Sequence, residues 1–227
     1  MGKHNRYLKN GFTLIEILIS FGIFAILMGI VLSGFMDTRK LERLRQSALE
    51  LVSTLQKAQN YALTGYAVSG IVPVGGYGVH FNLDLVNPAN TEYFIFADTY
   101  SVNSTTNLCD DTQGNQRYDN LLSNPICGEN PLGSGIFLHE GVIVHKILVN
   151  TNQAIAGSIF DVSFKSPMRM PYTGTGDAAA MRYPGVASAK SVDIFLKLKD
   201  KNICRKVNVK KNTGQINEQA VSWTVCQ

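Results

Sequence analysis

The chain has 227 residues, 45% of them hydrophobic and 17% charged, and its formal net charge is +4 at pH 7. This length is sufficient for one domain with a sizeable buried core. Of the 21 basic residues, Lys3, Arg6 and Lys9 lie among the first ten residues, which hold no acid, and the rest of the chain carries 18 basic against 17 acidic residues. Beyond its N-terminus the chain is close to neutral, which excludes net charge as an argument for a nucleic-acid partner.

A long apolar segment follows this basic leader. From Phe12 to Met36 the residues are apolar or small, and Glu16 is the only ionisable one. As a helix of about 25 residues at about 1.5 Å per residue, the segment can cross a bilayer core of about 30 Å. An acid within such a span is costly in hydrocarbon, so Glu16 indicates a function that involves a partner.

The junction between leader and span, residues 11–16 with the sequence Gly-Phe-Thr-Leu-Ile-Glu, resembles the signal of type IV pilins and of the pseudopilins of type II secretion. The resemblance implies that a prepilin peptidase cuts between Gly11 and Phe12 and methylates the new N-terminus at Phe12. It also implies that Glu16 neutralises the N-terminal amine of a neighbouring subunit during assembly, each charge removing the desolvation cost of the other. An uncleaved single-pass anchor is the alternative.

The charges around the span predict its orientation. Basic residues ahead of a span favour a cytoplasmic N-terminus. A secretory signal peptide is a poor match, because its cleavage site follows the apolar run. We therefore expect a single-pass protein of the inner membrane, in contact with lipid, whose head faces the periplasm or is carried on an extracellular filament. Four basic residues after the span weaken a simple charge count: Arg39, Lys40, Arg43 and Arg45.

Small residues recur inside the span. Ala25, Gly29 and Ser33 lie four residues apart. Small side chains at this spacing let membrane helices approach closely, which indicates helix packing in a filament core. Glycine is also common in membrane helices in general, and that interpretation stays open.

The helix is expected to continue past the membrane with one apolar face, because apolar residues follow at spacings of three and four. These residues are Leu41, Leu44, Ala48, Leu51, Leu55, Ala58 and Ala62. Thr64 and Gly65 predict its end.

Alternating apolar and polar runs predict that the remainder is mostly β. The expected strands cover residues 77–83, 92–98, 136–138, 142–149, 159–164, 191–198, 203–209 and a last run that ends at 221–225. Turns at 199–202 and 212–214 predict an antiparallel meander in the C-terminal third. Long loops are expected near 100–135 and 166–190.

The expected fold class is α+β, with a long N-terminal helix packed on an antiparallel β-sheet head. Four segments are predicted: a leader (1–11), a transmembrane or filament-core helix (12–36), its amphipathic continuation (37–64) and the β-rich head (65–227).

The Leu-Arg-rich stretch Leu41–Ala48 and the late hairpin Cys204–Ile216 resemble minor pilins and pseudopilins of the secretion protein H and fimbrial protein T type. This implies a structural subunit of a type IV pilus or a type II secretion pseudopilus. Its implied partners are other subunits, prepilin peptidase and the inner-membrane assembly platform. The choices between pilus and pseudopilus, and between major and minor subunit, stay open.

Four cysteines, an even number, favour disulfides in an exported domain. They are Cys109, Cys127, Cys204 and Cys226. We favour the local pairing, which joins Cys109 to Cys127 across the longest polar loop and Cys204 to Cys226 between the sheet and the last strand. Two other pairings are open.

The loop at residues 110–119 is rich in Asp and Asn and resembles a calcium loop. Asp110, Asp111, Asn115 and Asp119 could supply oxygen ligands. Because the spacing departs from an EF-hand and no glutamate closes the loop, a solvated turn is the simpler interpretation.

No catalytic activity and no cofactor are expected. His139, Glu140 and His145 lack the spacing of a His-Glu-x-x-His zinc motif. His80 stands alone in a predicted strand, where a histidine is usually structural or exposed.

Basic residues gather near the C-terminal hairpin: Lys197, Lys199, Lys201, Arg205, Lys206, Lys210 and Lys211. Some minor pilins of the fimbrial T type bind DNA through such residues. This implies an alternative function, a minor pilin whose head binds DNA or a surface for DNA uptake or adhesion. Asp200 interrupts the group, and charges on edge strands also guard against aggregation.

Overall fold

The structure is a computed structural model that describes residues 13–82, 92–99, 101–102, 109–110, 118, 131–150, 153–154, 159–165, 191–211 and 213–226. The chain forms two compact units, one up to Leu41 and one from Glu42 onward. Each unit is described by itself.

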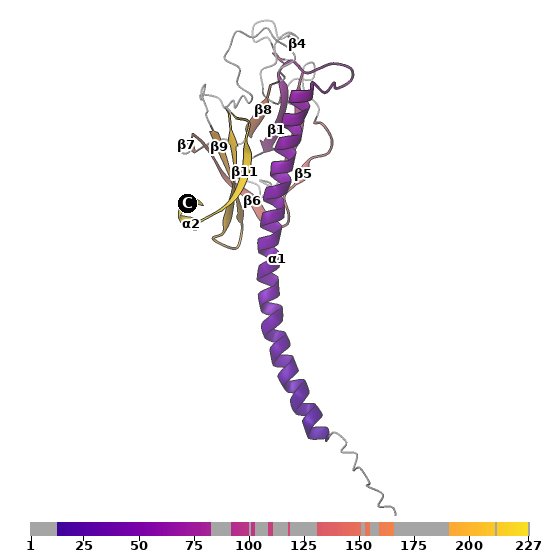
Figure 1. Ribbon diagram of the computed structural model, residues 1–227, viewed down its shortest axis with the longest axis vertical. Helices are drawn as coiled ribbons and strands as arrows, with labels where there is room; N and C mark the ends of the chain where they lie inside the picture. Colours follow the sequence, from indigo (N-terminus) through magenta and orange to yellow (C-terminus); the bar gives the residue numbers. More distant parts are fainter. Residues whose placement is uncertain are drawn as a thin grey trace, which may run out of the picture. The chain divides into compact units, whose positions relative to one another are not determined.

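One helix, α1 (Leu14–Thr64), runs through both units (Figure 1). Thr13 caps its start, since the Glu16 amide donates to the Thr13 Oγ1 at 3.3 Å. At its end, Gly65 has a φ of 62° and the Tyr66 amide donates to the Tyr61 carbonyl at 3.1 Å. The two tyrosine rings stack with their centroids 4.7 Å apart. This is a Schellman motif with its apolar contact, and it confirms the predicted end of the helix.

In the first unit, every described side chain from Thr13 to Leu32 is exposed. Leu14–Leu32 is long and apolar enough to cross a membrane, by its length and composition. An apolar helix surface of this extent, left bare by its own chain, requires lipid or other helices around it.

In the second unit, α1 buries the face that its periodicity predicts. Six of the seven expected apolar residues belong to the core: Leu44, Ala48, Leu51, Leu55, Ala58 and Ala62. Leu41, the seventh, is 40% exposed and is the last residue of the first unit. The buried face begins one turn later, at Leu44.

The first sheet has the strand order β5-β2-β1-β8, and every neighbouring pair is antiparallel. Its strands are β1 (Gly76–Asn82), β2 (Glu92–Asp98), β5 (Ile136–Phe137) and β8 (Ile159–Phe164). The alternating side chains Tyr77, Val79 and Phe81 of β1 enter the core with Tyr93 and Ile95 of β2.

The second sheet has the order β11-β10-β9-β6-β7 and is also antiparallel. Its strands are β6 (Val142–Val149), β7 (Gln153–Ala154), β9 (Ser191–Leu198), β10 (Cys204–Lys210) and β11 (Ile216–Val221). The hairpins β9-β10 and β10-β11 confirm the predicted meander. A separate pair joins β3 (Ser101–Val102) to β4 (Cys109–Asp110).

Both sheets and α1 share one core. Val192, Ile194, Leu196 and Leu198 alternate along β9 and lie in the same cluster as the helix residues and the inner face of β1. Phe195 points the opposite way and packs with Cys204 and Cys226 on the outer face of the second sheet. The α+β class with an antiparallel head is therefore as predicted.

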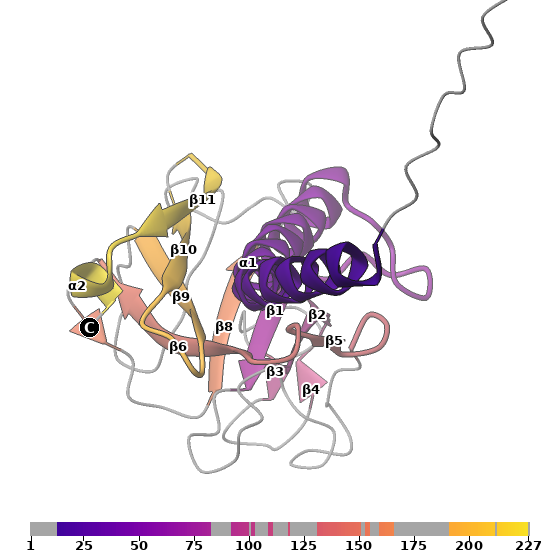
Figure 2. The same cartoon turned by 90° about the horizontal axis from the view of Figure 1, so that it is seen from below.

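The last predicted strand is wrong at its end. After Val221 the chain forms a short helix, α2 (Trp223–Cys226), in place of the strand expected up to Val225. Val221 pairs with Cys204, the first residue of β10, so residues beyond it have no further strand to pair with. The Val225 amide instead donates to the Ser222 carbonyl at 3.1 Å. In Figure 2, α2 and α1 lie on opposite sides of β9 and β10.

Candidate assembly site on the N-terminal helix

Glu16 lies in the first turn of α1, and its side chain is exposed. The partial positive charge at a helix N-terminus favours an acid in this turn. Thr13 and Glu16 have the spacing of a capping box, and the structure shows the Thr13 half of that motif. Sequence reasoning missed this cap, although Thr-x-x-Glu before an apolar run is its ordinary signal.

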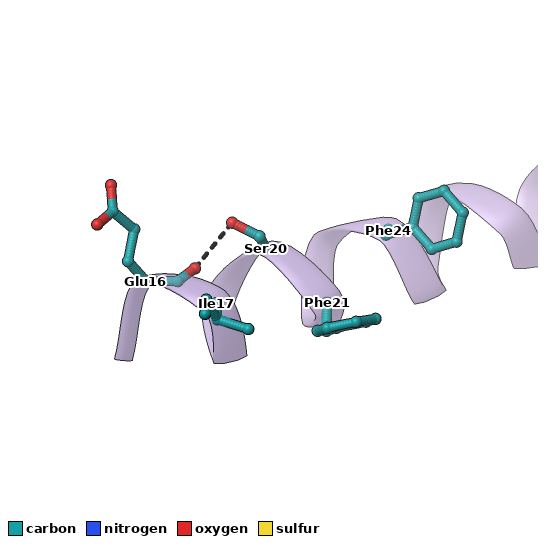
Figure 3. A pocket seen from close by; sticks show the side chains of 5 residues that line it. All are labelled: Glu16, Ile17, Ser20, Phe21 and Phe24. Atoms are coloured by element: carbon teal, nitrogen blue, oxygen red, sulfur yellow. Dashed lines mark hydrogen bonds between the residues drawn. The ribbon is translucent and has the colours of Figure 1, made fainter. Parts of the chain in front are cut away.

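The surroundings of Glu16 are apolar. Ile17, Phe21 and Phe24 line the same stretch of the helix surface, and Ser20 lies one turn later on the Glu16 side of the helix (Figure 3). The Ser20 hydroxyl donates to the Glu16 carbonyl at 2.7 Å, so it is satisfied by its own helix. The carboxylate itself points away from the other labelled side chains (Figure 3). Chemically it can accept charge-assisted hydrogen bonds from a cation on another molecule.

Gly11 and Phe12, the predicted cleavage and methylation positions, lie outside the described residues. Cleavage and methylation therefore stay predictions. Thr13, the first described residue, already belongs to the helix cap.

The small residues of the span present an open surface. Apart from the backbone of its own helix, a Cβ placed on Gly29 or Gly22 would meet no described atom within 4 Å. Ala25 is exposed, and Ser33 continues the same helix. This face is therefore available for close approach by another helix, and its packing role stays a prediction.

A disulfide joins Cys204 of β10 to Cys226 of α2, with Cα atoms 6.5 Å apart. The disulfide fixes the short helix α2 to the outer face of the second sheet. The sequence had predicted a strand in place of this helix. The Lys146 Nζ donates to the Val225 carbonyl at 3.3 Å and lies 5.0 Å from the Phe195 ring centroid. Cys109 lies in β4 and Cys127 lies outside the described residues, so their pairing stays a prediction.

His145 also contacts this C-terminal helix. Burial, together with the cations Lys197 and Lys146, lowers the pKa of His145, while a hydrogen bond with the backbone of Cys226 acts against that shift. Burial at this position therefore favours the neutral form of the imidazole.

Of the calcium candidates, Asp110 lies in β4, and Asp111, Asn115 and Asp119 lie outside the described residues. Within the described part of the chain, no three His, Cys, Asp or Glu side chains gather as metal ligands would. The interpretation of residues 110–119 as a solvated turn or a calcium loop therefore stays a prediction.

The basic residues near the hairpin do not all lie on one face of the second sheet, where Lys197 and Lys206 share a face. Arg205 and Lys206 are neighbours on β10, so they point to opposite faces of the sheet. Arg205 forms an ion pair with Glu218, and the Lys206 Nζ lies 3.7 Å from the Asp193 Oδ2. Lys199 and Lys201 lie in the turn before β10, whereas Lys210 and Lys211 lie about 20 Å away at its other end.

His139, Glu140 and His145, which the sequence analysis compared with a zinc motif, do not form a cluster of metal ligands. Glu140 is exposed in a turn and forms an ion pair with Arg43 at 3.4 Å. His139 precedes that turn, and His145 lies at a bulge between Val144 and Lys146.

His80, which the sequence presents as isolated, has a buried partner. Its Nδ1 lies 2.7 Å from the Asp161 Oδ1, and the Tyr118 amide donates to the Asp161 Oδ2 at 3.3 Å. The rings of Phe94 and Tyr118 lie 4.9 and 4.8 Å from the imidazole. The pair joins β1 to β8, strands about 80 residues apart, and no local spacing could reveal it. It is enclosed by aromatic rings and serves to satisfy buried polar groups.

The comparisons with known proteins concern only the N-terminus. Residues 6–32 match the family described as the prokaryotic N-terminal methylation motif. No curated protein sequence and no solved structure matches the chain. The chain therefore carries a type IV pilin-like signal that leads into an apolar helix able to serve as a membrane anchor.

Proposed function

We propose that this chain is a structural subunit, a minor pilin or pseudopilin, of a type IV pilus or a type II secretion pseudopilus. Prepilin peptidase cuts it after Gly11 and methylates Phe12. The helix anchors the subunit in the inner membrane with its N-terminus in the cytoplasm, and the assembly platform then packs the helices into a filament. The head faces the periplasm or the filament surface.

The observation that carries this proposal is the bare apolar surface of α1 with one acid on it. From Thr13 to Leu32 the chain covers none of its own helix, and Glu16 lies in the first turn of a segment that matches the methylation motif. After cleavage the new amine of Phe12 would be a cation at the same membrane depth. A carboxylate from a neighbouring subunit would neutralise it, and each charge would remove the desolvation cost of the other.

The alternative, a head that binds DNA, has less support. Arg205 and Lys206, at the centre of the basic set, point to opposite faces and are already paired with acids. DNA binding requires several free cations on one surface to neutralise phosphates.

The test is a Glu16→Gln variant, followed from the membrane to the surface filament. We expect membrane insertion and processing to persist, but the amount of subunit in sheared filaments to fall at least tenfold, because an unpaired buried amine costs about 3 kcal/mol or more. Ser20→Ala is the matched control, since the Ser20 hydroxyl bonds only its own helix. Equal incorporation of Glu16→Gln and Ser20→Ala would contradict the proposal.

A further inference from the structure

The second sheet ends at β11, which has a strand neighbour on one side only. β11 pairs with β10 along all six of its residues without a bulge. The other edges among the described strands are short or covered: β3, β4, β5 and β7 have two residues each, and residues 160–164 of β8 are buried. Asn217, Gln219 and Ala220 of β11 are exposed. In the part of the chain that the structure describes, β11 is therefore the long edge that remains open.

The register shows which main-chain groups of β11 point to the open side. In an antiparallel pair, these groups point to the partner strand at every second residue. The Lys210 amide donates to the Gln215 carbonyl at 2.9 Å, so residues 210 and 215 form a hydrogen-bonded pair. Along the β10–β11 register, the next residues of β11 that bond to β10 are then Asn217, Gln219 and Val221. The residues whose amides and carbonyls point away from β10 are Ile216, Glu218 and Ala220. No main-chain hydrogen bond between described residues reaches these groups from the open side.

β11 also lacks the features that usually protect an open edge, which are lysines, prolines, bulges and inward-pointing charges. Its sequence, Ile-Asn-Glu-Gln-Ala-Val, contains neither lysine nor proline. Its one charge, Glu218, forms an ion pair with Arg205 of β10, which neutralises it. An unprotected edge of this length is a template for a further strand, so we expect it to be covered in the functional protein.

An apolar surface of α1 flanks this edge on the core side. The Gln59 Nε2 donates to the Gly214 carbonyl at 2.9 Å, so this face of α1 lies beside the turn that leads into β11. Val52 and Leu63 share the face, because they lie two turns before and one turn after Gln59. Leu63 is 51% exposed, and Val52 packs on the core. A strand added to β11 with apolar side chains on its inner face would extend the core that already contains Ile216.

We propose that β11 is the docking site for an extended segment of another polypeptide, which adds to the second sheet as an antiparallel strand. Its amides and carbonyls pair with those of Glu218 and Ala220, at a spacing that a β-strand reproduces. Its side chains alternate, apolar towards α1 and polar beside Asn217 and Gln219 on the outer face. The main chain supplies affinity, and the alternation of side chains selects the partner. This inference does not rest on the proposed function, because it concerns the head alone.

A second copy of this chain is a poor occupant of the edge. Two β11 strands paired antiparallel would be related by a two-fold axis perpendicular to the sheet. This axis reverses every direction in the plane of the sheet, and α1 lies along the inner face of the sheet with its buried residues. The α1 helices of the two copies would then run in opposite directions, whereas helices anchored in one membrane with the same orientation run in the same direction. We therefore assign the added strand to a different protein.

The test measures amide hydrogen exchange by NMR in the full ¹⁵N-labelled chain in detergent micelles. The probe is acetyl-Lys-Thr-Val-Thr-Val-Thr-Lys-amide at about 5 mM, which largely fills a site with a Kd of about 1 mM. Its control is the same peptide N-methylated at both valines, which blocks the amides that would face β11. We expect the probe, but not the control, to slow exchange of the Glu218 and Ala220 amides about fivefold, close to the limit that this occupancy allows. The Gln219 amide, already bonded to β10, is expected to keep its rate.

Two substitutions test the edge itself. Ala220→Pro removes an amide that points to the open side and leaves the hydrogen bonds to β10 in place. We expect the protection of the Glu218 amide to be lost in this variant. It is expected to persist in Gln219→Ala, which changes an outer side chain and keeps every outward amide. If the proline disturbs β10, the methylated peptide still decides the question in the unsubstituted chain.

Three results would overturn the proposal: no protection by the probe, equal protection by both peptides, or protection that persists in a folded Ala220→Pro variant. A dilution series without peptide adds a fourth. Slower exchange of the Glu218 and Ala220 amides with rising protein concentration alone would assign the edge to a second copy and would also overturn it.

Discussion

At the scale of single residues, Glu16 differs from every other described side chain between Thr13 and Leu32, because it carries the only charge on that surface. Composition alone indicates that Glu16 has a functional partner, since a lone acid is costly in hydrocarbon, and this stays a prediction. His80 was not predictable, because its partner Asp161 comes from a strand far away in the chain. The division of Arg205 and Lys206 between two faces was predictable, because neighbouring residues of a strand point to opposite sides of the sheet.

His145 provides a prediction about pH. Its pKa is lowered in the folded state, so the unfolded chain binds the proton more readily. Stability is therefore full above the unfolded pKa of about 6.5 and is lost as the pH falls towards the folded value. Replacing His145 by Asn is expected to make the loss of stability between pH 7 and pH 5 shallower, by at most about 1.4 kcal/mol per pH unit.

The measurement is denaturant unfolding of the full chain in detergent at several pH values. Lys165→Gln, a change outside the β6–α2 contact, serves as a control and is expected to retain the wild-type slope. An unchanged slope in His145→Asn would contradict the role of this imidazole.

Tyr77 gives a second prediction at this scale. Its hydroxyl donates to the carbonyl of Tyr66, just after the end of α1, and burial together with Tyr66 and Tyr61 raises its pKa to about 12. Replacing Tyr77 by Phe keeps the ring but removes the bond. We expect a loss of about 1 kcal/mol in the free energy of unfolding, the usual net value of such a bond. A Tyr77→Phe protein with unchanged stability would show that the contact contributes nothing.

At the scale of elements, α1 was predictable because its period and its stop signal are local. The apolar face from Leu44 to Ala62 and the glycine at 65 follow from spacing and backbone conformation. The end of β11 was not predictable, because the composition of residues 221–225 favours a strand. Only the pairing of Val221 with Cys204, the first residue of β10, leaves the later residues without a strand to pair with. The Cys204–Cys226 bridge then holds the short helix, and closing a loop of about 20 residues contributes about 3 kcal/mol.

Side chains of different size at Gly29 test whether the small residues of the span pack against another helix. Gly29→Ala improves helix propensity by about 1 kcal/mol and adds one methyl group, whereas Gly29→Leu fills the space that a close helix contact needs. A Cβ at Gly29 meets no described atom outside its own helix backbone within 4 Å, and the position is exposed, so neither change is expected to disturb the single helix. We expect Gly29→Ala to enter sheared filaments normally and Gly29→Leu to be retained in the membrane. Equal incorporation of both would contradict close packing at this face.

At the scale of the whole chain, the two units differ in how their apolar side chains are removed from water. The unit from Glu42 onward buries an apolar core between one helix face and two sheets, and this follows from periods of 3.6 and 2 that the sequence displays. The strand order of the sheets could not be predicted from those periods, because pairing between distant strands has no local signal in the sequence. Examples are β6, which lies beside β9, and β1, which lies beside β8. The unit that ends at Leu41 buries none of its described side chains from Thr13 to Leu32, so its function depends on what surrounds it.

The most direct test of the account is the intact mass and N-terminal sequence of the protein, taken from sheared surface filaments and from membranes of the same cells. We predict a chain that begins at methylated Phe12. Its presence in the sheared fraction would assign it to a pilus, and its presence only in membranes would favour a pseudopilus or a rare subunit. An intact leader beginning at Met1 in both fractions would contradict the account.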